Sequence, residues 1–185
     1  MTRRSAVLAA VGLALLAQLA TARVTAPTLL RWNRIDVPGL PKLVLWNASA
    51  SAPRGLYLLR SASPLHIGEL VAVMPPEPLA RFAAMRGYLP LGVPLLKHIA
   101  VLGGHTVCRF ADRVTIDGRT AALARERDSR GRTLPRWQGC RTMRADEVFL
   151  LNSAIPDSFD GRYFGVLSAN TITARAEPLW IISEP

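Results

Sequence analysis

The chain has 185 residues, which is enough for one domain of ordinary size but leaves little room for a second domain beside a membrane segment. Its formal charge is +10, from 23 basic and 13 acidic residues. The basic residues are spread along the whole chain, without zinc-finger spacing, an RNA-binding aromatic motif or a dense basic run, so the charge does not favour nucleic-acid binding. The three histidines and two distant cysteines give no metal site with plausible ligand spacing, and we expect no cofactor.

The N-terminus carries a candidate membrane segment. Residues 1–4 (Met-Thr-Arg-Arg) precede an apolar run at 5–22, in which Gln18 is the only strongly polar side chain. A helix of this length spans about 27 Å, barely enough for a bilayer core. We predict an uncleaved transmembrane anchor at 5–22, a cytoplasmic N-terminus at 1–4 and a linker at 23–41. The alternative is a cleaved signal peptide, because residues 20–22 (Ala-Thr-Ala) have the small-x-small form of a cleavage site.

The remainder, residues 42–185, has the pattern of an antiparallel β domain. Turn signals at 103–104 (Gly-Gly) and 117–118 (Asp-Gly) separate several short β-type runs, as hairpins require. One short helix is predicted at 77–86, after two prolines and before a glycine. The expected fold class is mainly β, with one transmembrane helix and one short internal helix. The predicted strands are 42–46, 55–60, 69–74, 99–102, 106–110, 113–116, 147–151 and 179–182.

Two serines lie in a stretch of small residues just before a predicted strand. Residues 47–57 read Asn-Ala-Ser-Ala-Ser-Ala-Pro-Arg-Gly-Leu-Tyr and contain Ser49 and Ser51. A nucleophilic serine needs access for an extended substrate and nearby donors for an oxyanion, and small side chains leave the backbone accessible for both. Taken alone, the same composition also fits an ordinary loop.

The chain contains only two lysines, Lys42 and Lys97, although it is rich in arginine. Lysine can lose its proton at accessible pH, whereas arginine cannot. Lys97 lies in the apolar run 94–104, and if it points inward, burial lowers the pKa of its amine towards the range of a general base. The alternative is a lysine on an edge strand that points to solvent.

A third polar stretch lies between two apolar runs at residues 149–165. Asp160 and Arg162 can form an ion pair there, and Ser158 can orient a neighbouring amine. By itself this pattern also fits a capped loop.

Together the three stretches resemble the type I signal peptidases, and most closely the TraF-type branch, the conjugative-transfer peptidases that process pilin precursors. The specific parts are S-x-S-x-P-x-G-L-Y, L-L-K-x-I-x-x-x-G-G and S-F-D-G-R-Y-F-G, in the family's order. The last motif departs from the ordinary secretory enzymes, whose version is richer in Gly, Asp and Asn. The resemblance implies that Ser51 is the nucleophile and Lys97 the general base. It also implies that Ser49 is an oxyanion donor and that Ser158 positions the base. Asp160 and Arg162 would then form the supporting ion pair. Ser49 is the competing nucleophile.

The resemblance also implies a location and partners. We expect a serine endopeptidase in the bacterial inner membrane, with its catalytic domain on the periplasmic side, that cuts a membrane-embedded precursor, either a pilin or a secretory preprotein. Water or the precursor's own N-terminus can resolve the acyl-enzyme. The rivals are a general secretory signal peptidase, a non-catalytic anchored scaffold of a pilus or secretion machine, and a basic nucleic-acid-binding domain.

A Ser-His-Asp triad is a further alternative, because the chain also has histidines. His98 directly follows Lys97, so the two side chains face opposite sides of a strand and only one of them can reach a common serine. His105 follows a Gly-Gly turn, and His66 lies outside every motif.

The two cysteines, Cys108 and Cys140, predict a disulfide, because an even count in an extracytoplasmic domain favours pairing. Two buried free thiols are the alternative.

Overall fold

The computed structural model describes residues 44–182. The predicted anchor at 5–22 and linker at 23–41 lie outside the described residues and stay predictions. Within 44–182, no helix is both long enough and apolar enough to cross a membrane.

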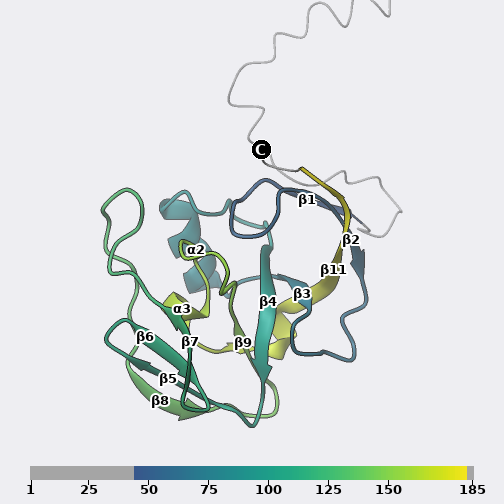
Figure 1. Ribbon diagram of the computed structural model, residues 1–185. Coiled ribbons are helices and arrows are strands. Elements are labelled where there is room, and N and C mark those ends of the chain that lie inside the picture. The colour runs from purple at the N-terminus through teal and green to yellow at the C-terminus, as the bar shows by residue number, and fades with distance from the viewer. Residues whose placement is uncertain (1–43, 183–185) are drawn as a thin grey trace, which may run out of the picture. The chain divides into compact units, whose positions relative to one another are not determined.

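A seven-stranded antiparallel sheet forms the larger part of the domain (Figure 1). Its strand order is β1-β2-β11-β3-β4-β9-β10, so the last long strand inserts between the second and the third. The bounds are β1 (Val44–Asn47), β2 (Gly55–Arg60), β11 (Ile172–Ile181), β3 (Leu70–Val73), β4 (Leu95–Leu102), β9 (Glu147–Leu150) and β10 (Leu167–Ser168).

A second antiparallel sheet has the order β7-β6-β5-β8 and lies beside the lower ends of β4 and β9 in the view of Figure 1. Its strands are β7 (Arg119–Leu123), β6 (Arg113–Ile116), β5 (Thr106–Phe110) and β8 (Gly139–Thr142). The helical elements are short: α2 (Glu77–Met85), α3 (Gly161–Phe164) and the 3-10 turn η2 (Ala169–Thr171). The prediction of a mainly antiparallel β domain with a short internal helix is therefore confirmed for the described residues.

Several strands differ from the sequence prediction. The run predicted at 99–102 is the second half of β4, which begins at Leu95. The prediction started too late because Lys97 and His98 interrupt the apolar pattern. The run predicted at 179–182 is the end of β11, whose register shifts after Pro178, a residue that cannot donate to the ladder. Strands β7, β8 and β10 were not predicted: β7 and β8 are largely exposed and β10 has two residues, so none of them shows the apolar alternation of a half-buried strand.

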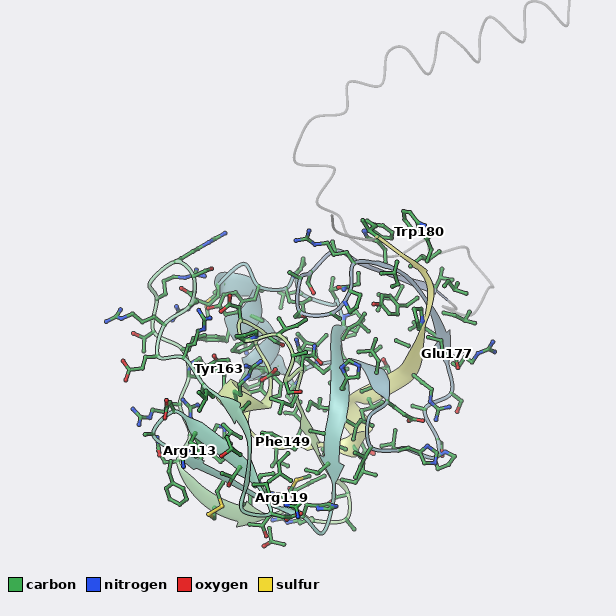
Figure 2. The ribbon with its side chains drawn as sticks, viewed as in Figure 1. Arg113, Arg119, Phe149, Tyr163, Glu177 and Trp180 are labelled. Carbon is green, nitrogen blue, oxygen red and sulfur yellow. A yellow bond between two sulfur atoms is a disulfide. The ribbon has the colours of Figure 1, made fainter. Side chains whose placement is uncertain are left out.

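An aromatic cluster fills the space between the small sheet, α2 and α3. Phe159 stacks on Tyr163 with ring centroids 5.8 Å apart and on Phe82 at 5.6 Å. Figure 2 places Tyr163 and Phe149 in the interior, whereas Arg113 and Arg119 lie on the small sheet. This cluster contacts the polar loop 152–160, since Phe159 belongs to both.

Cys108 and Cys140 form a disulfide across the β5–β8 pair, as predicted. They are directly opposite each other in the register, with Cα atoms 4.0 Å apart. The bridge therefore joins the two strands that enclose the arginine-rich segment 119–136.

We predict that the double variant Cys108→Ser/Cys140→Ser loses about 3–4 kcal/mol of unfolding free energy, because the bridge closes a loop of 32 residues in the unfolded chain. Urea unfolding of the wild type and the variant measures the loss. Neither cysteine is among the predicted site residues, so the folded variant should keep the wild-type activity. A loss of stability below about 1 kcal/mol would show that the bridge does not constrain the unfolded chain in this way.

Candidate active site

The serine loop, residues 48–54, connects β1 to β2 and is organised by Asn47. The Asn47 side chain is buried, and its Nδ2 donates to the carbonyls of Ser49 at 3.1 Å, Ala52 at 3.0 Å and Pro53 at 3.0 Å. Its Oδ1 accepts from the Ser49 backbone N–H at 3.1 Å. One amide therefore satisfies the backbone of a turn that has no ladder partner.

The loop brings the two serine hydroxyls together. Ser49 Oγ lies 3.0 Å from Ser51 Oγ and donates to Asn47 Oδ1 at 3.0 Å. Because the single Ser49 proton is used on Asn47, the Ser51 hydroxyl is the donor between the two serines in this arrangement. Both serines are half-buried, and Ala48 and Ala50 beside them are exposed, so an extended chain has access to the loop.

Lys97 is buried in β4 and is 1% exposed, so of the two alternatives left by the sequence the inward-pointing lysine is the correct one. It shares one face of the strand with Leu95 and Ile99, which belong to an apolar cluster. Its Nζ donates to Ser158 Oγ at 2.9 Å. An ammonium group has three protons, and this is the one hydrogen bond of Nζ within residues 44–182.

Burial lowers the pKa of Lys97 from 10.5 to about 8. The Asp160 carboxylate opposes this shift by attraction, whereas the Arg162 guanidinium adds to it by repulsion. With a pKa of about 8, roughly one Lys97 in ten is neutral at pH 7, against about one in three thousand at the ordinary value. The site therefore supplies a free amine at neutral pH.

Asp160 and Arg162 form a buried ion pair beside Ser158. Arg162 Nε donates to Asp160 Oδ1 at 2.9 Å and Nη2 donates to Oδ2 at 2.8 Å, with both side chains at most 1% exposed. Gly161 between them packs so closely on β9 that a Cβ would lie 2.7 Å from the Leu150 carbonyl oxygen. The D-G-R sequence is thus required by packing on β9 as well as by charge.

Arg162 also orders the loop that carries Ser158. Its guanidinium donates to the carbonyls of Ile155 at 2.7 Å, Pro156 at 3.0 Å and Ser158 at 3.3 Å. A second buried arginine, Arg109 of β5, donates to the Arg162 carbonyl and so connects the small sheet to α3. The ion pair therefore determines where the Ser158 hydroxyl lies.

The sequence analysis did not identify Asn152, which follows β9. Its Nδ2 donates to the carbonyl of Ser51 and to that of Leu96 at 3.2 Å, and its Oδ1 accepts from the His98 backbone N–H at 3.0 Å. Its own N–H donates to Asp160 Oδ2 at 3.0 Å. The available signal was a polar residue inside the third polar stretch, directly after the apolar run 148–151.

The six predicted site residues fall into two hydrogen-bonded groups, Ser49 with Ser51 and Lys97 with Ser158, Asp160 and Arg162. Within residues 44–182 no hydrogen bond joins Ser51 Oγ directly to Lys97 Nζ. Asn152 donates to the backbone carbonyl of Ser51 and to that of Leu96, which precedes Lys97.

The described histidines do not bond to either serine. His98 Nδ1 bonds to Asn152 Oδ1 at 3.0 Å, while His105 pairs with Asp117 and His66 with Glu69 at the surface. The arrangement of this part of the chain therefore gives no support to the Ser-His-Asp alternative.

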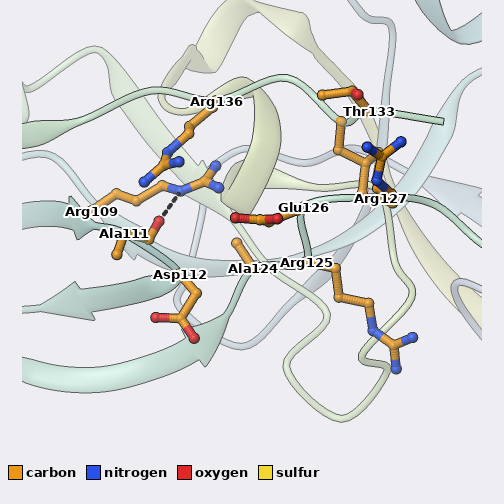
Figure 3. A pocket seen from close by; sticks show the side chains of 10 residues that line it. Arg109, Ala111, Asp112, Ala124, Arg125, Glu126, Arg127, Thr133 and Arg136 are labelled. Atoms are coloured by element: carbon orange, nitrogen blue, oxygen red, sulfur yellow. Dashed lines mark hydrogen bonds between the residues drawn. The ribbon is translucent and has the colours of Figure 1, made fainter. Parts of the chain in front are cut away.

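A cavity of about 550 Å³ lies elsewhere, between the small sheet and the segment 124–136 (Figure 3). Arg109, Arg125 and Arg136 line it together with Asp112 and Glu126. None of the six predicted site residues borders it.

Comparison with known proteins identifies the chain's relatives. A family model described as signal peptidase, peptidase S26, matches residues 7–181. The conjugal transfer protein TraF of Agrobacterium fabrum is 32% identical over 144 residues, which cover 72% of this chain and 80% of that protein. The probable conjugal transfer protein TraF of Sinorhizobium fredii is 35% identical over 142 residues, covering 71% of this chain and 73% of that protein.

A plasmid transfer protein TraF from Escherichia coli is 33% identical, with 72% of this chain and 80% of that protein covered. Among solved structures, a signal peptidase I from Enterococcus faecalis V583 matches with 19% identity and a TM-score of 0.36, over 63% of this chain and 98% of that one. The resemblance that the three motifs indicated is therefore confirmed: the chain belongs to the signal peptidase S26 family and is similar to TraF-type conjugal transfer proteins.

Proposed function

We propose that this protein is a membrane-anchored serine endopeptidase that cuts a membrane-inserted precursor with Ser51 as nucleophile and Lys97 as general base. The observation that carries the proposal is the buried Lys97, whose pKa of about 8 leaves a neutral amine available near pH 7. A lysine that served only as a surface cation would not be 1% exposed beside a buried ion pair.

In the proposed mechanism, Lys97 takes the proton of the Ser51 hydroxyl, and Ser51 Oγ attacks the scissile carbonyl. The hydroxyl first turns from Ser49 towards the amine. The Ser51 N–H and the Ser49 hydroxyl then stabilise the negative charge on the carbonyl oxygen, for which Ser49 must release Asn47 Oδ1. Ser158 holds the amine, and the Asp160–Arg162 pair holds Ser158. When the intermediate collapses, the peptide C–N bond breaks and Lys97 gives its proton to the leaving amine, which leaves the acyl group on Ser51. Water, or the amine at the N-terminus of the precursor, then attacks this ester and releases the acyl group.

The precursor of a conjugative pilus subunit is the proposed substrate. Support comes from the relatives named for conjugal transfer and from the S-F-D-G-R-Y-F-G motif, which resembles the TraF-type branch. The proposed location is the bacterial inner membrane, with the described domain on the periplasmic side and the precursor and the lipid bilayer as partners; the disulfide supports an oxidising compartment.

The test is precursor cleavage by full-length enzyme in lipid vesicles. We expect wild type to cut a pilin precursor faster than a secretory preprotein, and Ser51→Ala to cut neither. Removal of a nucleophile typically costs about 10⁶-fold in rate, whereas removal of one oxyanion donor costs about 10²–10³-fold. Ser49→Ala should therefore keep weak activity that Ser51→Ala lacks.

Ser61→Ala is the matched control, because Ser61 is an exposed serine after β2. Activity in Ser51→Ala with loss in Ser49→Ala would make Ser49 the nucleophile. Full activity in both variants would favour the non-catalytic scaffold, and faster cleavage of the secretory preprotein would favour a general signal peptidase. Mass spectrometry of the product distinguishes a linear peptide from a circular one.

A further inference from the structure

We propose that Asn152 is a positioning residue that holds the serine loop against β4 and so sets the distance from the Ser51 hydroxyl to the Lys97 amine. This inference rests on the proposed function of the same site.

The Asn152 side chain uses its full hydrogen-bonding capacity. The two protons on Nδ2 go to the carbonyls of Ser51 and Leu96, and the two lone pairs on Oδ1 accept from His98 N–H and from His98 Nδ1. Asn152 is 4% exposed, so water cannot satisfy these polar groups if the Asn152 side chain is removed. A side chain without both donors and acceptors cannot satisfy all four partners.

The Asn152 backbone joins the same residue to the ion pair. Its N–H donates to Asp160 Oδ2 at 3.0 Å, and its carbonyl accepts from Arg162 Nη2 at 3.3 Å. Asn152 therefore contacts the loop that carries the nucleophile, the strand that carries the base and the pair that orders Ser158.

The sheet itself does not fix the gap between Ser51 and Lys97. The serine loop joins β1 to β2 at one edge of the large sheet, whereas β4 is separated from β2 by β11 and β3. Asn47 shapes the turn, but the hydrogen bonds of its side chain stay within residues 47–53. Asn152 supplies a direct polar connection from the loop to β4.

Such a connection controls rate through geometry. Displacement of a reacting group by about 1 Å can cost about 10²-fold in rate, because the proton and the attacking oxygen must both be in line. Loss of the Asn152 amide leaves Lys97 bonded to Ser158, so the amine stays buried and its charge environment stays the same. The serine loop keeps the apolar packing of buried Ala52 in the cluster that contains Leu96 of β4 but loses its hydrogen bond to Asn152, so it can shift relative to Lys97.

The experiment compares Asn152→Ala with Asn170→Ala in full-length enzyme in lipid vesicles, using a cleavable precursor peptide. Asn170 is an exposed asparagine in η2, so the control makes the same chemical change away from the site. For Asn152→Ala we expect kcat to fall about 10–100-fold, KM to change less than about threefold and the midpoint of the pH profile to stay at the wild-type value. Asn170→Ala should match wild type in all three.

Two additional arms keep the proposal falsifiable if Asn152→Ala is unstable. In Asn152→Asp the carboxylate still accepts from His98 but faces the Ser51 and Leu96 carbonyls without a proton, so we expect a larger fall in kcat. Its negative charge should also raise the pKa of Lys97 and so move the pH midpoint above that of wild type.

Amide hydrogen exchange of the segment 48–54 should become faster in both variants, relative to the core strand β3, even in inactive protein.

Wild-type kcat in a folded Asn152→Ala variant would overturn the proposal, as would unchanged exchange in 48–54. A shift of the pH midpoint in Asn152→Ala would show that Asn152 acts on the charge of Lys97 instead. The exchange measurement does not depend on catalysis, so the positional role can succeed or fail whether or not Ser51→Ala remains active.

Discussion

Replacement of Lys97 by arginine is expected to lower kcat/KM by about 10³-fold or more, because a general base must lose its proton and arginine stays protonated even after large pKa shifts. The substitution preserves the positive charge, so a lysine that served only as a cation would tolerate it. The measurement is precursor cleavage by folded protein, checked by circular dichroism. A folded Lys97→Arg variant with a tenth or more of wild-type activity would contradict the Ser51/Lys97 mechanism.

The pH dependence of cleavage tests the protonation state of the same residue. The neutral amine is the active form, and burial places the pKa of Lys97 at about 8. Activity should therefore rise with pH through about 8 and level off above it, instead of rising up to the ordinary lysine value of 10.5. The profile of kcat/KM reports this pKa for the free enzyme. A midpoint near 6.5 would instead indicate a histidine base.

Two variants control for folding and for charge. Lys42→Arg makes the same substitution at the only other lysine and should leave activity unchanged. Lys97→Met removes the base without burying a permanent cation, so it separates loss of catalysis from loss of stability. Both Lys97 variants should be inactive, while Lys97→Met should be the more stable of the two.

Replacement of Asp160 by asparagine is expected to cost about 3–5 kcal/mol of unfolding free energy, since it leaves the Arg162 guanidinium buried without its counter-ion. Denaturant unfolding measures the loss. The same change should lower the pH midpoint of cleavage, because the Asp160 carboxylate raises the pKa of Lys97 by attraction. The two effects have different causes and are measured separately.

Asp157→Asn is the matched control for Asp160→Asn. Asp157 lies three residues earlier on the same loop and pairs with Arg125 at 2.9 Å, but both side chains are more than half exposed. Water screens such a pair, so its loss should change neither stability nor the pH midpoint appreciably. An equal loss of stability in the two variants would contradict the importance of burial at Asp160.

The amino-acid sequence by itself predicted the family and the disulfide, which the comparisons and the structure confirm, and it proposed the residues of the candidate site. Ser51, Lys97 and Asp160 were identifiable because each lies in a short motif whose residue types are tied to a chemical role. Most strands with apolar alternation were also predicted, among them β2, β5 and β6, whose bounds agree with the structure. Each of these features depends on residues that are close in the sequence, so a short sequence pattern can predict it.

The tertiary structure decided what depends on distant contacts. The burial of Lys97 and its lowered pKa arise from the strands and loops packed around β4. The hydrogen bond from Asn152 to the Ser51 carbonyl joins residues that are 101 positions apart in the chain. Strands β7 and β8 form by pairing with β6 and β5, although they are mostly exposed. A hydrogen bond between distant segments leaves no periodic signal in either one, because each partner alone has the composition of an ordinary loop or strand.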